Sequence, residues 1–328
     1  MSCARALQRP RRSHHGYLGE DARGIPAALD KEFGISSPRG HGLDAVDSIR
    51  AMREGTVSVF MAMGGNFLSA TPDTDVTAGA LRNCALTVQV STKLDRSHLV
   101  HDHTGIILPS LGRTDKDIHG GRKQFVSVED SMSAVHLSRG SLTPVSDHLR
   151  SEVAIVCELA QRLFEPAHPL PWAEFADDYD RIRDSIARVV PGFEDFNTRV
   201  RQPDGFMLPH PPRDERRFAT TTGKANFVVN DLDWVPVPAG RLNLQTMRSH
   251  DQYNTNIYGL DDRYRGVKGG RRVLFVNERG IGNLGTAAGD RVNLVSEWTR
   301  PDGIVEERHT DDFQVAPYPT PVGNVAAY

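Results

Sequence analysis

A chain of 328 residues is long enough for two domains, each with a hydrophobic core of its own. Hydrophobic residues make up 38% of it and charged residues 25%, which is ordinary for globular protein, and the formal net charge is −3. This balance lacks the basic footprint of a nucleic-acid-binding protein, and no apolar run approaches the roughly 20 residues that a bilayer-spanning helix needs. We therefore expect no nucleic-acid partner and no membrane partner.

The N-terminal segment, residues 1–41, is predicted to be disordered or irregular. Paired arginines at positions 11 and 12 are not followed by an apolar stretch, so no export signal is expected. The three cysteines, Cys3, Cys84 and Cys157, are scattered and lack the spacing of a disulfide framework or an iron–sulfur site. Cys84 and Cys157 are expected to be small core residues, and a reducing cytoplasm is the expected compartment.

Residues 42–200 are predicted to form an α/β domain with a parallel sheet. Three apolar, β-rich runs indicate buried strands: residues 56–63, 86–90 and 105–109. Apolar residues at helical spacing from Leu43 to Met52 indicate a helix before the first strand, and a second helix, capped by Thr71, separates the first two strands. This alternation of strand and helix is typical of parallel α/β units.

Polar turns follow the first two predicted strands. The first is Gly64-Gly65-Asn66 and the second is Ser91-Thr92-Lys93. Ligands of parallel sheets bind beside the carboxyl ends of the strands, where glycines let the backbone approach a phosphate or a guanine and an Asn amide both donates and accepts. A Gly-Gly-Asn sequence by itself is more often only a turn, and its place after a buried strand is what favours a binding edge.

The rest of the chain divides into helices, a linker and a β-rich region. Two amphipathic helices are predicted to complete the α/β domain, at residues 149–163, with Ser146 as N-cap, and at residues 182–189. Residues 201–235 are polar and contain several prolines, so they are interpreted as a linker. Short β-like runs begin at residues 227–229, and residues 236–328 are predicted to form a β-barrel domain.

Two groups of segments resemble, in order and in separation, the third and fourth domains of the large subunits of molybdenum oxidoreductases. The first group is VFMAMGGNFLSATPDT (59–74), LTVQVSTKLDRSHLV (86–100) and GIILPSLGRTDKD (105–117); the second is LQTMRSHDQYNTNIYGLDDRYRG (244–266) and residues 277–296. The resemblance covers residues 42–328 and is closest to formate-dehydrogenase-like alpha subunits. It implies that residues 236–328 form a C-terminally truncated molybdopterin dinucleotide-binding β-barrel, of the double-psi type that the Gly289-Asp290 turn resembles.

The resemblance also implies a cofactor, bis-molybdopterin guanine dinucleotide. Gly64, Gly65 and Asn66 match the family's turn that approaches the dinucleotide, although family members often carry Glu and Pro around that Asn. The residues on the guanosine edge are Gln89, Ser91, Thr92 and Lys93, with Asp117 as a guanine partner. The residues that match the pterin-lining segment of the barrel are Thr246, Arg248, Gln252, Asn254 and Thr255, and donors of this kind suit pterin and pyrophosphate groups.

The same resemblance implies that the catalytic centre lies outside this chain. The family's molybdenum ligand, the His and Arg of formate-type members and any iron–sulfur cluster all precede the matched region. We therefore expect a C-terminal, cofactor-binding part of a formate-dehydrogenase-like molybdopterin oxidoreductase, without catalytic or metal-ligating residues and inactive by itself. The expected partners are the molybdopterin cofactor and either the missing N-terminal half or another subunit.

Other interpretations stay open. The main alternative is a non-catalytic nucleotide- or protein-binding module derived from such an enzyme, and a third is a fragment without a separate role. His98, His101 and His103 invite a metal site, but no Cys or carboxylate at suitable spacing completes a tetrahedral set. The basic residues between Arg263 and Arg272 form either a solvated face or a phosphate contact. No G-x-S-x-G elbow supports a Ser/His/Asp hydrolase.

Overall fold

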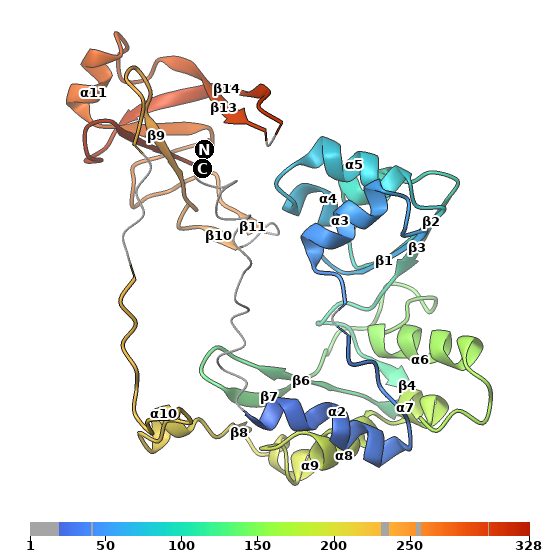
Figure 1. Cartoon of the computed structure of the whole chain (residues 1–328). Helices are drawn as coiled ribbons and strands as arrows, with labels where there is room; N and C mark the ends of the chain where they lie inside the picture. Colours follow the sequence, from blue (N-terminus) through green and yellow to red (C-terminus); the bar gives the residue numbers. More distant parts are fainter. Residues whose placement is uncertain (1–19, 41, 231–235, 254–256, 301) are drawn as a thin grey trace. The chain divides into compact units, whose positions relative to one another are not determined.

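The computed structural model describes residues 20–40, 42–230, 236–253, 257–300 and 302–328 (Figure 1). The chain divides into two compact units. The described residues up to Phe227 form the first unit, and those from Val228 onward form the second. The division lies inside the segment predicted to be a linker, residues 201–235.

The first unit contains a three-stranded parallel sheet in the order β1-β2-β3. Its strands are β1 (Val59–Met63), β2 (Leu86–Ser91) and β3 (Thr104–Pro109). The helical elements around them are α3 (Ala45–Arg53), α4 (Phe67–Ala70), α5 (Thr74–Arg82) and the 3-10 helix η1 (Arg96–Leu99). Met61 of β1 pairs with Val88 of β2, which pairs with Ile106 of β3. The predicted parallel sheet is therefore confirmed.

Apolar side chains of α3, α4 and α5 form a core on one side of this sheet (Figure 1). Cys84 is buried in this core, as predicted. The prediction of buried first and third strands was wrong, because Val59, Met61 and Met63 of β1 are 55%, 40% and 42% exposed, and Ile106 and Ile107 of β3, the other end strand, are 40% and 43% exposed. β1 lies at the edge of the sheet, so only one neighbouring strand shields it.

Two helices begin later than their sequence patterns predict. α5 begins at Thr74 rather than directly after Thr71, because the Asp73 carboxylate accepts a backbone N–H of the first turn at 3.2 Å. α6 (Glu152–Leu163) is capped by Ser151 rather than Ser146. The reason is that the carbonyl oxygen of Arg150 accepts a backbone N–H from the chain after β3 at 2.9 Å, which keeps the preceding residues out of the helix.

The remainder of the first unit combines short antiparallel strands with helices. The strands are β4 (Ile118–His119), β5 (Arg122–Lys123), β6 (Val126–Glu129), β7 (Ala134–Ser138) and β8 (Phe206–Met207). The helices, besides α6, are α2 (Glu20–Phe33), α7 (Trp172–Asp177), α8 (Tyr179–Val189), α9 (Phe196–Arg199) and α10 (Pro211–Asp214). β4 pairs with β5, and β7 pairs with β6 and β8. α8 confirms the second predicted amphipathic helix, and Cys157 lies buried on α6 as predicted.

Two segments predicted to be irregular contain regular structure. Helix α2 lies within residues 1–41, and its Glu32 accepts a hydrogen bond from Arg188 of α8 at 2.6 Å. Strand β8 lies within residues 201–235, where Gly205 is so close to β7 that a Cβ would lie 2.0 Å from a carbonyl oxygen of that strand. Both elements depend on partners far away in the chain, which a local sequence pattern does not show.

The second unit is a curled, five-stranded sheet in the order β13-β14-β12-β15-β9 (Figure 1). Its strands are β9 (Asn243–Thr246), β12 (Val273–Val276), β13 (Arg291–Thr299), β14 (Val305–Pro317) and β15 (Asn324–Ala327). A separate pair, β10 (Gln252–Tyr253) with β11 (Ile257–Tyr258), and helix α11 (Glu278–Asn283) accompany it. Every residue of β12 is buried, so this strand carries the core.

The mixed α/β class is confirmed, whereas a closed barrel of the double-psi type stays a prediction. β13 and β9 are the end strands of the sheet as the described residues define it. The β-like run at residues 227–229 was wrong: it is not a strand, and Phe227 and Val229 are 98% and 94% exposed. Within the described ranges, no helix is both long enough and apolar enough to cross a bilayer.

Candidate functional site

The carboxyl ends of β1, β2 and β3 meet at one edge of the parallel sheet, which is where ligands of such sheets bind. The chain leaves β1 through Gly64, whose N–H still donates to the carbonyl oxygen of Val90 at 2.8 Å. Gly64 and Gly65 then adopt φ angles of +66° and +74°, a region that side-chain-bearing residues seldom enter. Both predicted glycines are thus at the edge, and their backbone conformation explains the residue type.

Asn66 lies between this turn and α4, and one of its side-chain atoms has no hydrogen-bond partner in the described structure. It holds the N-cap position of α4, but its side chain makes no capping hydrogen bond. Its Oδ1 is buried without a hydrogen-bond partner in the described structure. A buried polar atom without a partner costs about 1–3 kcal/mol, so an arrangement of this kind calls for a ligand or a water.

The turn after β2 positions the next group of predicted residues. The Ser91 hydroxyl donates to the carbonyl oxygen of Lys93 at 2.5 Å and closes a tight turn, and Thr92 and Lys93 are exposed on it. Gln89 differs from them, because its side chain is buried and Nε2 donates to the carbonyl oxygen of Ser97 at 3.1 Å. Gln89 therefore holds η1 in place and has its amide directed into the protein, away from the solvent edge.

His98, on η1, has the second buried atom without a hydrogen-bond partner in the described structure. The backbone N–H of Asp95 donates to its Nδ1 at 3.0 Å, so the ring hydrogen of the neutral form is on Nε2. The side chain is only 3% exposed, and Nε2 has no partner in the described structure. η1 is held against α4, because the Ser97 hydroxyl accepts the N–H of Leu68 at 3.0 Å.

Ser110, directly after β3, has the third buried atom without a hydrogen-bond partner in the described structure. Its N–H donates to the carbonyl oxygen of Ser91 at 3.1 Å, which continues the sheet by one residue. The residue is 4% exposed, and its hydroxyl has no hydrogen-bond partner in the described structure.

These three atoms distinguish the sheet edge from the rest of the molecule. The described residues contain four buried side-chain atoms without partners, and three of them, on Asn66, His98 and Ser110, follow the three parallel strands in turn. They comprise an acceptor, a donor and a hydroxyl that can act as either. A ligand with several heteroatoms, such as a purine or a ribose, has complementary groups, so the chemistry of these three side chains is compatible with a nucleotide-bearing ligand.

The remaining predicted residues lie elsewhere. Asp117 is in the first unit beside β4, where its Oδ2 accepts the Tyr179 hydroxyl at 2.7 Å. In the second unit, Thr246 ends β9, and the carbonyl oxygen of Arg248 accepts a hydrogen bond from the Arg265 side chain at 3.1 Å. Gln252 accepts one from the Arg271 side chain at 2.8 Å. Asn254 and Thr255 lie outside the described residues.

A buried ionic cluster in the second unit was missed by the sequence interpretation. Asp262 is 1% exposed, and its carboxylate contacts His250 Nδ1 at 3.0 Å and Arg265 at 2.8 Å. Burial alone would raise the pKa of Asp262, but the hydrogen bonds from His250 and Arg265 outweigh it and hold the pKa well below the ordinary value. Tyr328 also donates to this carboxylate, at 3.3 Å, and burial followed by the Asp262 charge raises its pKa to about 12.

The basic residues of this region therefore do not all form a solvated face, because Arg265 neutralises a buried carboxylate. Asp262 could not be recognised from the sequence, since nothing local separates a buried carboxylate from an exposed one beside arginines. Its only signal is its position directly before the basic segment.

The histidines near β3 do not converge on a metal. In the part of the chain that the structure describes, no group of three His, Cys, Asp or Glu residues is arranged to hold one. His101 instead covers Gly105, where a Cβ would lie 2.9 Å from the ring, and the exposed His103 lies 3.3 Å from the Asp102 carboxylate.

Comparison with known proteins finds relatives that match over part of their length. No family model matches the sequence. The chain is 68% identical over 327 residues to uncharacterized oxidoreductases of Mycobacterium tuberculosis (strain H37Rv) and Mycobacterium bovis, a match that covers 97% of this chain and 42% of each relative. It is 40% identical over 330 residues to the protein YdeP of Escherichia coli (strain K12), covering 43% of YdeP. The chain thus spans less than half the length of the relatives that it matches.

Proposed function

We propose that this chain is the cofactor-binding part of a molybdopterin oxidoreductase of the formate-dehydrogenase-like type. The observation that carries the proposal is the set of three unpartnered polar atoms at the carboxyl edge of the parallel sheet. The mycobacterial relatives, which are named oxidoreductases and match 97% of the chain, support the redox class. The proposed cofactor is bis-molybdopterin guanine dinucleotide, and this edge is its proposed binding region in the first unit.

In this proposal the residues of the chain bind and orient the cofactor. The backbone of Gly64 and Gly65 offers close approach to a phosphate or base, and the Asn66 amide and Ser110 hydroxyl offer hydrogen bonds to guanine or ribose. Lys93 is exposed at the same edge and has a charge suited to the pyrophosphate. When bound, the molybdenum centre supplies two-electron oxidation of a small substrate such as formate.

The second unit is proposed to hold the pterin side through Thr246, Arg248 and Gln252, together with Asn254 and Thr255. Its curled sheet is proposed to be part of a double-psi barrel. Asp117 is set apart from the sheet-edge group by its hydrogen bond with Tyr179, and its place as a guanine partner stays a prediction.

A second candidate is a non-catalytic nucleotide-binding module with the same edge. The state of the two described thiols agrees with such a module, because both Cys84 and Cys157 are buried and burial raises the pKa of each. Protonated, buried thiols are poor nucleophiles and poor redox groups, so the described residues offer no thiol chemistry of their own. Addition of the remaining part of a relative with molybdenum cofactor, followed by dye-linked formate oxidation, separates the two candidates: turnover supports the enzyme, and its absence with retained nucleotide supports the module.

The binding edge is tested by titrating the purified chain with guanosine diphosphate and, separately, adenosine diphosphate in a calorimeter. We expect the guanine nucleotide to bind more tightly. The Asn66→Ala variant should lose about tenfold in affinity, as expected for one hydrogen bond in a buried site, whereas Asn226→Ala, which changes an exposed Asn of the same unit, should bind as wild type. Equal binding of both nucleotides, or unchanged affinity in Asn66→Ala, would contradict the proposal.

A further inference from the structure

A cavity lies in the first unit, and none of its lining residues belongs to the sheet edge. Its volume is about 220 Å³, and it is lined by residues 116–117, 123–124 and 139–141. A water molecule in the liquid occupies about 30 Å³, so the cavity accommodates a small hydrated ion or one end of a larger ligand. Each of the three lining segments contributes one cation: Lys116, Lys123 and Arg139.

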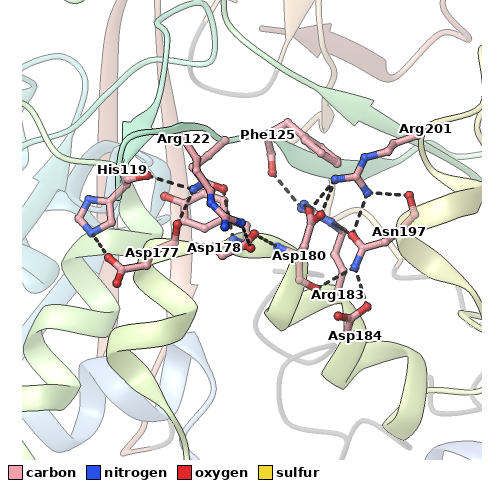
Figure 2. Close-up of polar contacts among 12 residues, drawn as sticks. His119, Arg122, Phe125, Asp177, Asp178, Asp180, Arg183, Asp184, Asn197 and Arg201 are labelled. Carbon is pink, nitrogen blue, oxygen red and sulfur yellow. Dashed lines mark hydrogen bonds and ion pairs between the residues drawn. The ribbon is translucent and has the colours of Figure 1, made fainter.

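These three cations differ from the basic residues around them. In the neighbouring network, Arg122 pairs with Asp178, and Arg183 and Arg201 both pair with Asp180 (Figure 2). In the described structure, by contrast, no carboxylate forms an ion pair with Lys116, Lys123 or Arg139. The cavity therefore gathers three cations that form no ion pair among the described residues.

The hairpin of β4 and β5 anchors the backbone that carries Lys123. Its Gly120-Gly121 turn lies against the last residue of α7, where a Cβ on Gly120 would be 3.0 Å from the carbonyl oxygen of Asp177. The buried Gln124 donates to that same carbonyl oxygen at 2.8 Å and accepts the N–H of Tyr179 at 3.2 Å. The strand β5 is thus anchored at both ends.

Alternation along β5 separates its two cations. Successive side chains of a strand point to opposite faces, so Arg122 and Lys123 are directed apart. Arg122 pairs with Asp178 on one side (Figure 2), and Lys123 lines the cavity on the other.

The opposite wall depends on a close crossing of two backbone segments. The N–H of Lys116 donates to the carbonyl oxygen of Leu142 at 2.8 Å, and the N–H of Ser141 donates to that of Thr114 at 2.9 Å. At Gly140 a Cβ would lie 1.9 Å from the carbonyl oxygen of Asp115, so only glycine permits this crossing. The crossing brings the segment of Arg139 beside the segment of Lys116.

Asp117 is the one carboxylate that lines the cavity. Its Oδ2 accepts the Tyr179 hydroxyl, which keeps its hydrogen because burial and the nearby carboxylate raise the pKa of Tyr179. One carboxylate against three cations leaves the cavity positive, and the remaining carboxylate oxygen can accept a hydroxyl of the ligand. Lysine and arginine are the usual partners of phosphoryl oxygens.

We propose that this cavity binds a phosphoryl group through Lys116, Lys123 and Arg139, with Asp117 accepting a hydroxyl from the same ligand. The inference goes beyond the proposed function and does not need it, because no residue of the sheet edge contributes to the cavity. The phosphoryl group has two possible sources, a free phosphate or the phosphates of a nucleotide.

The test is calorimetric titration of the full chain with inorganic phosphate and with guanosine diphosphate at low ionic strength. Lys123→Ala and Arg139→Ala should each weaken phosphate binding about tenfold, the equivalent of one charge-assisted hydrogen bond, and Lys123→Arg should retain most of it. Lys31→Ala removes an exposed cation of α2 and serves as the matched control. Thermal unfolding midpoints of the two alanine variants should equal that of wild type, because neither side chain has an ion-pair partner to lose in the described structure.

The outcomes divide clearly. Phosphate binding that is weakened in both alanine variants and unchanged in Lys31→Ala and Asn66→Ala supports a free-phosphate site. Guanosine diphosphate binding that is weakened in the same variants, without measurable phosphate binding, supports a nucleotide source. Unchanged affinity for both ligands in Lys123→Ala and Arg139→Ala, or an equal loss in Lys31→Ala, overturns the proposal. If Asn66→Ala alone changes guanosine diphosphate binding, the sheet edge holds the nucleotide and the cavity does not.

Discussion

The carboxyl edge of the parallel sheet and the Asp262 cluster both contain buried polar atoms, and the two regions differ in whether those atoms have hydrogen-bond partners. The Asp262 carboxylate has donors from His250, Arg265 and Tyr328. At the sheet edge, Asn66 and Ser110 each keep a buried atom without a partner. A network whose groups are all paired stabilises the fold, whereas unpaired groups in a comparable environment mark a place that a ligand can complete. We therefore expect the Asp262 cluster to stabilise the fold, whereas the sheet edge stays the proposed binding region.

The largest expected effect on stability comes from disrupting the Asp262 cluster. Asp262→Ala leaves the Arg265 charge, which is only 17% exposed, without its partner, and loss of one member of a buried ion pair costs about 3–5 kcal/mol. Hydrogen exchange of β12, at the centre of the second unit, should speed up accordingly. Asp311→Ala, at an exposed position of the same unit, should leave exchange unchanged. Equal exchange rates in the two variants would mean that the cluster does not stabilise the second unit.

The second expected effect is on how the free energy of unfolding depends on pH. The dependence has opposite signs at acid and at alkaline pH. The depressed pKa of Asp262 contributes stability above the ordinary Asp pKa of about 3.9, and that stability is lost as the pH falls through the lower, folded-state value. Tyr328, whose pKa is raised to about 12, contributes stability below the ordinary Tyr value of about 10 that is lost as the pH rises toward 12. Denaturant unfolding across pH should show a flatter acid limb in Asp262→Asn and a flatter alkaline limb in Tyr328→Phe. If wild type and variants gave parallel profiles of unfolding free energy against pH, the titration of this cluster would not contribute to stability.

The smallest expected effect on stability is a gain rather than a loss. It lies at the sheet edge, where buried atoms have no partners in the described structure. Ser110→Ala removes a buried hydroxyl that has no partner, so the variant should be as stable as wild type or more stable by about 1 kcal/mol. Ser185→Ala is the matched control, because the buried Ser185 hydroxyl donates to the carbonyl oxygen of Arg181 at 3.0 Å and its loss should destabilise the protein. Chemical unfolding of the two variants measures the difference. A marked loss of stability in Ser110→Ala would show that the hydroxyl has a partner in solution and would weaken the comparison.

The sequence predicted the sheet and the turns at its carboxyl edge because both depend on local chemistry. Residues 86–90 and 105–109 are short apolar runs rich in residues that favour strands, and Gly64 precedes a turn that needs positive φ. Helix α2 and strand β8 escaped prediction because they are stabilised by partners distant in sequence.

Residue roles at the site were harder to predict than its position. Gln89 was expected on the solvent edge, but its amide is matched to a carbonyl oxygen of η1, and no property of the strand sequence shows that this acceptor will be there. Likewise, Lys123 and Arg139 lie 16 positions apart in a sequence full of basic residues. Only the folded hairpin and the Gly140 crossing place them around one cavity.

The exposed face of β1 has a consequence for the behaviour of the chain at high concentration. Val59, Met61 and Met63 are exposed on an edge strand. An apolar surface therefore lies beside backbone N–H and C=O groups that pair with no neighbouring strand in the described sheet. Strand edges of this kind template pairing between molecules. Colloidal solubility, rather than folding stability, is therefore expected to set the upper concentration for work with the isolated chain.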